Sequence, residues 1–327
     1  MADENGGNAS SAKISPLKFA LIVAAILGGI YVYKNQEKFF KPAEKSPVEI
    51  AATPETEAPT APLQIPGPNP MQTIRIATWD LTPLDFQKLG DNTRADRIVD
   101  TVAEFDIVAI QGVAMRNTLA MDEIVRRLEA KKKQYAYTAY PESLGRVPEY
   151  MVILYNKETI RIDLSTIFEV IDSPLTHRPL LASFCTVAPP VDKAFTFTLV
   201  SIKIDEERRN QEVASLGNIY KSLRDKILPE DDLIMLGNFA MPVRMIDSLA
   251  TVVSLVAVHS DFPTTSDGAL SCDNILFDRL KTTEYVEKAA VVDLMTKYNL
   301  QIADIYPLTS HLPVYAEFSI FESGNPD

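Results

Sequence analysis

The sequence predicts an α/β fold in which two mixed, mainly antiparallel sheets pack face to face with helices outside, preceded by an N-terminal transmembrane helix. From Thr73 onward, short apolar runs with strand character are interspersed with segments whose apolar residues follow helical spacing. Some successive strands are joined as in hairpins and others through a helix, which is typical of mixed sheets. A charge-free apolar run near the N-terminus indicates the anchor.

The apolar run covers 15 residues, from Phe19 to Tyr33, between two lysines. A span typically needs about 20 residues, and the neighbouring apolar residues extend this one, so we assign residues 19–35 to the anchor. No small-residue cleavage pattern follows directly, which favours a retained anchor over a cleaved signal peptide. More lysines follow the run than precede it, which argues against export of the C-terminal part. The short polar head, residues 1–18, instead favours a single-pass protein whose soluble domain is extracytoplasmic.

Residues 36–70 are expected to form a linker between the anchor and one domain, residues 71–327. The stretch from 42 to 70 contains eight of the 22 prolines and no aromatic residue, so it is expected to form an extended spacer. The net charge of −12 comprises +2 through residue 41, −3 from this stretch and −11 from the domain. So acidic a domain is not a general polyanion binder, because nonspecific nucleic-acid binding needs many Lys and Arg residues.

Within the domain, the elements follow from periodicity. The expected strands cover residues 74–80, 106–113, 135–140, 150–156, 178–187, 195–204, 232–239, 270–277 and 312–321. The expected helices cover residues 93–105, 118–133 and 207–226. The first of these helices has Ile98, Val102 and Phe105 on one side, as a helix packed on a sheet requires.

The cysteines and histidines form no metal motif by their spacing. Cys185 and Cys272 are expected to be small buried apolar side chains, and the sequence leaves open whether they pair. On the residues alone, His311 is a strand-edge residue, and His177 and His259 stand apart from it.

Seven segments nevertheless occur in a telling order: IRIATWD, DIVAIQGV, ESLGRVPEYMVILY, FTLVSIKI, LIMLGNFAMP, SCDNILF and LTSHLPVYAEF. In this order and spacing the chain resembles the endonuclease/exonuclease/phosphatase superfamily, most closely its deoxyribonuclease I-like branch, over residues 73–321. The resemblance implies a four-layered α/β sandwich with a divalent-metal phosphodiesterase site where the strand ends meet. In such a site, carboxylates hold the cation and a His–Asp pair transfers protons.

The resemblance identifies the positions of this chain that correspond to that site. They are Asp80, Gly112, Glu149, Lys203, Asn238, Ala240, Asp273, Ser310 and His311. His311 and Asp273 match the family, and Asp80 stands where the family has a metal-site asparagine. The SLGR segment keeps Arg146, and Glu149 aligns with a family glutamate across a stretch about two residues shorter.

Five positions depart from the family pattern. Gly112 replaces the principal metal-ligating glutamate, and Lys203 replaces a histidine. Asn238 and Ala240 replace the aspartate and the asparagine of a GDFN segment, and Ser310 replaces the aspartate of an SDH segment. Removing one oriented group from an active site commonly costs about 10²- to 10³-fold in rate, so together these changes predict an inactive site.

We therefore interpret the chain as a membrane-anchored pseudoenzyme that binds an unknown protein or ligand without hydrolysis and needs no cofactor. The alternative is a divergent metal-dependent nuclease or phosphatase acting on an extracytoplasmic phosphoester, with Mg²⁺ or another divalent cation at Asp80, Glu149 and Asp273. A purely structural envelope protein is a third interpretation. The first predicts an ion pair between Lys203 and Asp80, with the ammonium in the cation's place. The second predicts that Asp80 lies about 3–5 Å from His311.

Overall fold

The computed structural model describes residues 72–114, 119–139, 149–170, 173–227, 232–259 and 262–322. The head, the anchor and the linker predicted for residues 1–70 lie outside these ranges, as does Arg146. Within the described ranges, no helix has both the length and the apolar character needed to cross a bilayer.

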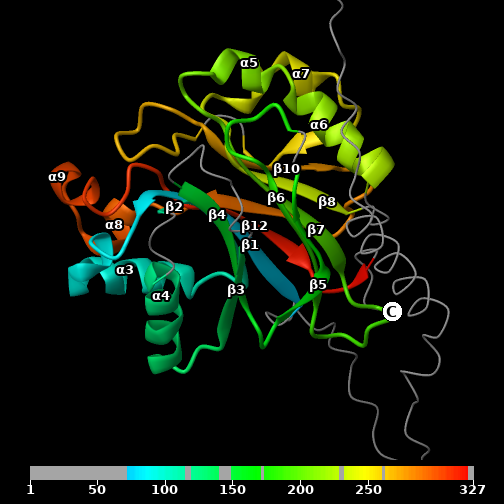
Figure 1. Cartoon of the computed structure of the whole chain (residues 1–327). Coiled ribbons are helices and arrows are strands. Elements are labelled where there is room, and N and C mark those ends of the chain that lie inside the picture. Colours follow the sequence, from blue (N-terminus) through cyan, green and yellow to red (C-terminus); the bar gives the residue numbers. More distant parts are fainter. Residues whose placement is uncertain are drawn as a thin grey trace, which may run out of the picture. The chain divides into compact units, whose positions relative to one another are not determined.

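Two six-stranded sheets form the domain (Figure 1). The first sheet has the order β11–β12–β1–β2–β4–β3, and the second has the order β5–β6–β7–β8–β10–β9. The first comprises β1 (Thr73–Leu84), β2 (Ile107–Ala114), β3 (Tyr135–Ala139), β4 (Glu149–Asn156), β11 (Tyr285–Val291) and β12 (Val314–Ser319). The second comprises β5 (Ile160–Glu169), β6 (Leu180–Thr186), β7 (Thr196–Lys203), β8 (Leu233–Asn238), β9 (Leu255–Ala257) and β10 (Asp273–Asp278). The pairs β1–β2 and β7–β8 are parallel and the other paired strands antiparallel, so both sheets are mixed as predicted.

Helices cover the outer faces of both sheets. Those beside the first sheet are η1 (Lys88–Gly90), α3 (Asn92–Val102), α4 (Leu119–Ala130), α8 (Leu294–Tyr298) and α9 (Ile302–Ile305). Those beside the second sheet are α5 (Arg209–Val213), α6 (Leu216–Ser222), η2 (Leu223–Ile227), η3 (Val243–Met245) and α7 (Asp247–Ala250). A hydrophobic core lies between each sheet and its helices, and a third lies between the sheets. The described residues therefore form a four-layered α/β sandwich, as the resemblance implied.

The structure adds three strands that the sequence did not predict, β5, β9 and β11. Each lies at a sheet edge and pairs with a single neighbour. Half of such a strand faces solvent, so its apolar pattern is weak, as in the largely exposed middle of β5. The helix expected over 207–226 is instead two short helices and a π-helical turn. The break lies at Ser215, whose backbone N–H and hydroxyl both donate to the carbonyl of Glu212.

Strand alternation determines where the functional side chains lie. Ile74 and Ile76 of β1 pack in the core between the sheets, whereas Ala77 and Trp79 pack against the helices. Successive residues of a strand point to opposite faces, so Asp80 continues the row of Ile74 and Ile76 into the space between the sheets.

Candidate functional site

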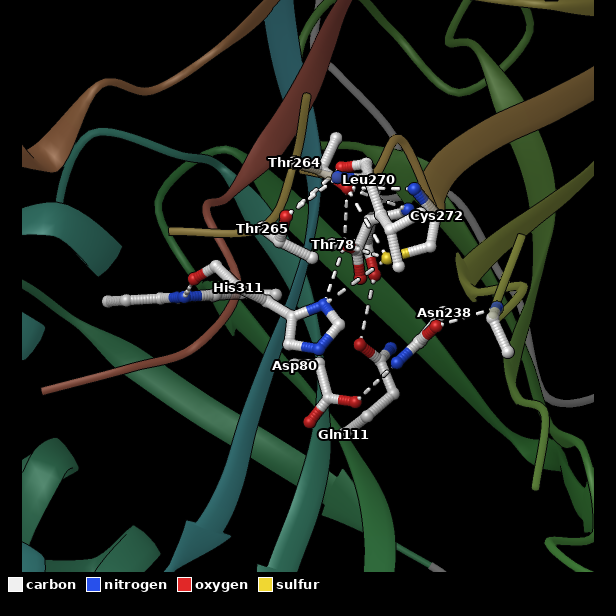
Figure 2. A network of polar contacts seen from close by, with 12 residues as sticks. Thr78, Asp80, Gln111, Asn238, Thr264, Thr265, Leu270, Cys272 and His311 are labelled. Atoms are coloured by element: carbon white, nitrogen blue, oxygen red, sulfur yellow. Dashed lines mark hydrogen bonds and ion pairs between the residues drawn. The ribbon is translucent and has the colours of Figure 1, made fainter. Parts of the chain in front are cut away.

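The same alternation brings six polar residues from six strands to one end of the space between the sheets. They are Asp80 of β1, Gln111 of β2, Glu149 of β4, Lys203 of β7, Asn238 of β8 and Asp273 of β10. The strand registers set Asp80 opposite Gln111, and Asn238 opposite both Lys203 and Asp273. Figure 2 shows Asp80, Gln111, Asn238 and His311 converging on this region.

Lys203 links Asp80 and Glu149, two of the three carboxylates that the alternative interpretation assigns to a metal. Its ammonium Nζ lies 2.7 Å from Oε1 of Glu149 and 3.6 Å from Oδ2 of Asp80. It also donates a hydrogen bond to Oγ1 of Thr82. The ion pair between Lys203 and Asp80 predicted from the sequence is therefore present, and the ammonium lies among the oxygens that a cation would otherwise use.

Asp80 is buried and ionised. The Asn238 amide donates to Oδ2 at 2.9 Å, and the Thr82 backbone N–H and hydroxyl donate to Oδ1 at 3.0 and 2.5 Å. Burial alone would raise the pKa of Asp80, but Lys203, His311 and these hydrogen bonds outweigh it and lower the pKa to about 2. The carboxylate is therefore held charged by the protein itself.

The side-chain amide of Asn238 is oriented to donate to the charged carboxylate of Asp80. Its Nδ2 donates to Asp80 while its Oδ1 accepts the backbone N–H of Ala240 at 2.8 Å, so both ends of the amide are satisfied. The family resemblance puts asparagine at position 80 and aspartate at position 238, and this chain carries the reverse. The acid and the amide have exchanged strands, and in this chain they are joined by a hydrogen bond.

Gly112 cannot hold the family's glutamate in this backbone. Its φ is +78°, and a Cβ built there would lie 1.9 Å from Oγ1 of Thr82. Residues of L configuration rarely adopt such a φ, so a larger residue would be strained as well as blocked. Thr82 stands here because β1 continues past Asp80 to Leu84, with a shift of register between them.

His311 and Asp273 form the second half of the site. Nδ1 of His311 lies 2.8 Å from Oδ2 of Asp273, and the Thr264 hydroxyl donates to the same oxygen at 2.7 Å. Burial lowers the pKa of His311, but Asp273, Cys272 and Asp80 more than compensate and raise it to about 11. The imidazole is thus protonated at neutral pH, which makes it a poor general base.

The other substituted positions contribute no side-chain chemistry to the site. Ala240 is buried in the left-handed region with φ 56°, and Ser310 is exposed. The Ser310 carbonyl accepts the backbone N–H of Ser266, which joins the loop before β10 to the segment that carries His311. Among the described residues, His311 makes no hydrogen bond or ion pair with Asp80; the two charges attract through space.

The residues do not fit the divalent cation that the resemblance implies. Mg²⁺ requires six oxygen ligands in near-octahedral geometry. Here the Lys203 ammonium lies between Asp80 and Glu149, Thr82 fills the space of the missing glutamate, and Asp273 is bonded to His311. A cation could bind between Asp80 and Glu149 only if the lysine left.

Sequence reasoning missed three residues that shape this site. Thr82 lies two positions after Asp80, and this spacing was its only sequence signal. Cys272 lies beside His311, with Sγ 3.7 Å from Nδ1, and both cysteines are free thiols. His177 lies 3.6 Å from Glu149. Burial lowers the pKa of His177, and Lys203 lowers it further against the opposing effect of Glu149.

Comparison with known proteins agrees with this architecture. No family model matches the chain. Deoxyribonuclease-1 of Equus caballus is 20% identical over 259 residues, which cover 74% of this chain and 90% of that protein. Deoxyribonuclease-1 of Bos taurus gives the same identity and coverage. Among solved structures, humanized TDP2 of D. rerio has a TM-score of 0.55 at 13% identity, covering 76% of this chain and 99% of that one. The human Nocturnin catalytic domain has a TM-score of 0.51 at 16% identity, with coverages of 76% and 95%.

The domain therefore has the fold of the endonuclease/exonuclease/phosphatase superfamily. Its sequence is similar to deoxyribonuclease I, in agreement with the segments that first indicated that branch.

Proposed function

We propose that this chain is a membrane-anchored endonuclease/exonuclease/phosphatase-like pseudoenzyme that binds a partner or ligand without hydrolysis. The observation that carries the proposal is the Lys203 ammonium, 2.7 Å from Glu149 and 3.6 Å from Asp80. A fixed monovalent group in this position neutralises the carboxylates but offers neither a Lewis acid nor a bound water to attack phosphorus.

Three further features support loss of hydrolysis. Asn238 carries an amide, which cannot accept a proton from water, and both ends of this amide are hydrogen-bonded to Asp80 and to the Ala240 backbone. Thr82 fills the space beside Gly112. His311 is already protonated at neutral pH. Each of these features removes a different part of the phosphodiesterase mechanism.

Exposed apolar side chains support a binding role. Phe86 follows β1 and is 50% exposed, and Phe262 and Leu270, in the segment before β10, are 70% and 47% exposed. That segment reaches the site, because Thr265 forms a β-bridge with His311 and Leu270 lies near the polar network (Figure 2). Exposed apolar side chains that gather into a contiguous patch mark surfaces that bind partners, and we propose that these three contribute to such a patch.

The experiment is a hydrolysis assay of the purified full chain on plasmid DNA and bis(4-nitrophenyl) phosphate, with Mg²⁺, Mn²⁺ or Ca²⁺. We expect rates equal to those of His311→Ala under every condition. Metal-dependent turnover that the His311→Ala variant abolishes would overturn the proposal.

A divergent phosphodiesterase or phosphatase is the second candidate, favoured by the intact His311–Asp273 pair. The relatives that are named deoxyribonucleases support the nuclease form of this candidate. In the same assay it predicts activity that also falls in Asp80→Ala and Glu149→Ala, because it assigns the metal to those carboxylates.

We further propose that residues 19–35 anchor the chain and that the domain is extracytoplasmic. The support is the apolar run and its short polar head. We expect the chain to resist alkaline extraction from membranes and the domain to be cleaved by protease added to intact cells. Release at high pH would contradict the anchor, and protection from protease would contradict the orientation.

A further inference from the structure

Cys272 extends the His311–Asp273 pair into a group of three possible metal ligands. Its Sγ lies 3.7 Å from Nδ1 of His311 and 3.5 Å from Oδ2 of Asp273, and these two atoms are 2.8 Å apart. We propose that Cys272, Asp273 and His311 form a site for a zinc-type divalent cation. This site shares Asp273 with the metal position of the alternative interpretation but uses Cys272 and His311 in place of Asp80 and Glu149.

The spacing of the three atoms is close to one face of a zinc tetrahedron. Zinc bonds of about 2.3 Å to sulfur and about 2.0–2.2 Å to nitrogen and oxygen place S···N and S···O about 3.6 Å apart, and N···O about 3.4 Å apart. The two distances from sulfur already agree within about 0.1 Å. The nitrogen and the oxygen are closer because they share a hydrogen bond, so this pair must open by about 0.6 Å when the cation replaces the proton.

A second observation points to a missing ligand. Asp273 is 1% exposed, and its Oδ1 has no hydrogen-bond partner among the described residues. An unsatisfied buried oxygen of a charged group is costly, because it has lost its water without gaining a partner. A cation that binds Asp273 through both carboxylate oxygens would satisfy Oδ1 as well as Oδ2.

The ligand types select the cation. A thiolate with an imidazole and a carboxylate suits Zn²⁺ or Co²⁺, whereas Mg²⁺ and Ca²⁺ prefer oxygen ligands alone.

Neighbouring hydroxyl groups hold the three ligands in place through hydrogen bonds. Oγ1 of Thr264 donates to Asp273 and accepts the backbone N–H groups of Cys272 and Asp273, each at 3.0 Å. The backbone N–H of His311 donates to Oγ1 of Thr309 at 3.1 Å.

Binding exchanges protons for the metal. The Cys272 sulfur loses its proton to form the metal–sulfur bond, Nδ1 of His311 loses its proton to form the metal–nitrogen bond, and both protons pass to solvent. The charged groups that act on the imidazole are Asp273, Asp80 and Asp267. Since protons compete with the metal, the titration is best made at about pH 8. The inference goes beyond the proposed function and does not depend on whether phosphoesters are hydrolysed.

The test is titration of the chelator-treated, untagged full chain with Co²⁺. We expect one equivalent to produce the visible bands of tetrahedral cobalt and a thiolate-to-cobalt charge-transfer band, both removed by Zn²⁺. Cys272→Ser should lose the charge-transfer band, and the matched control Cys185→Ser, which removes the other free thiol, should retain it. Zn²⁺ should also raise the Tm of the wild type and of Cys185→Ser, a readout that does not require the Cys272 variant to fold. Absence of the charge-transfer band and of the Tm shift in the wild type, or their loss in Cys185→Ser, would overturn the proposal.

Discussion

Replacing Lys203 with methionine tests the reasoning about the site most directly. The change keeps an apolar side chain of similar length but removes the ammonium from between Asp80 and Glu149. Breaking a buried ion pair by deleting one partner typically costs about 3–5 kcal/mol, because the remaining charge is left uncompensated. We expect the free energy of unfolding at pH 7 to fall by about that amount.

The pKa of Asp80 supplies an independent magnitude. It is lowered from 3.8 to about 2, and each pKa unit corresponds to about 1.4 kcal/mol, so the favourable environment of Asp80 contributes about 2.5 kcal/mol. A depressed carboxyl pKa stabilises the fold above the unfolded-state value, and this contribution disappears as the pH falls from about 4 to about 2. The cost of Lys203→Met should therefore be smaller at pH 3 than at pH 7, by about 1 kcal/mol.

Urea denaturation at the two pH values measures both effects. The matched control is Lys288→Met, which removes an exposed lysine 3.6 Å from Glu317 and should cost less than about 1 kcal/mol. With the ammonium gone, millimolar Mg²⁺ or Mn²⁺ should raise the Tm of Lys203→Met more than that of the wild type. A variant within about 1 kcal/mol of the wild type at pH 7 would refute the assignment of Lys203 as a built-in cation.

Three further predictions concern the neighbouring positions. Gly112→Glu should destabilise the domain by roughly 3 kcal/mol in thermal unfolding, through steric overlap and its positive φ, whereas Gly90→Ala, with no atom within 4 Å, should have little effect. Asn238→Asp should cost roughly 3 kcal/mol at pH 7, because it sets a second carboxylate against Asp80. The double variant Asp80→Asn/Asn238→Asp should recover most of that loss in denaturation, and additive costs would contradict the exchanged pair. His311, with its pKa raised to about 11, should remain protonated at pH 9 in ¹⁵N NMR spectra. Its stabilising effect should fade as the pH rises from about 6.5 toward 11, and a neutral ring at pH 8 would contradict this.

The sequence was sufficient for the architecture and for the Lys203–Asp80 ion pair. Lys203 ends β7 and Asp80 lies within β1, both central strands, and alternation from Ile76 and Leu199 puts them on the face between the sheets. The edge strands β5, β9 and β11 were missed because their residues are only half covered, whereas the edge strand β3 was predicted. The sequence therefore predicts the position of those site residues that continue the alternating apolar pattern of a buried strand.

The remainder depended on backbone detail that periodicity does not encode. Thr82 reaches Gly112 only because β1 shifts register after Asp80. Cys272 was predicted to be a buried apolar residue, and it is buried, but its contact with His311 depends on how the loop before β10 packs. Such contacts join segments of different loops and leave no spacing signal in the chain.

The exchanged Asp80–Asn238 pair and the Thr82–Gly112 contact also bear on the history of the site. A change toward the family pattern at one of these positions is expected to be harmful unless a second position changes with it, so the present arrangement should revert only through paired changes. In sequences that descend from the same ancestor, positions 80 and 238 should vary together. Position 112 should regain a carboxylate only where position 82 has become smaller.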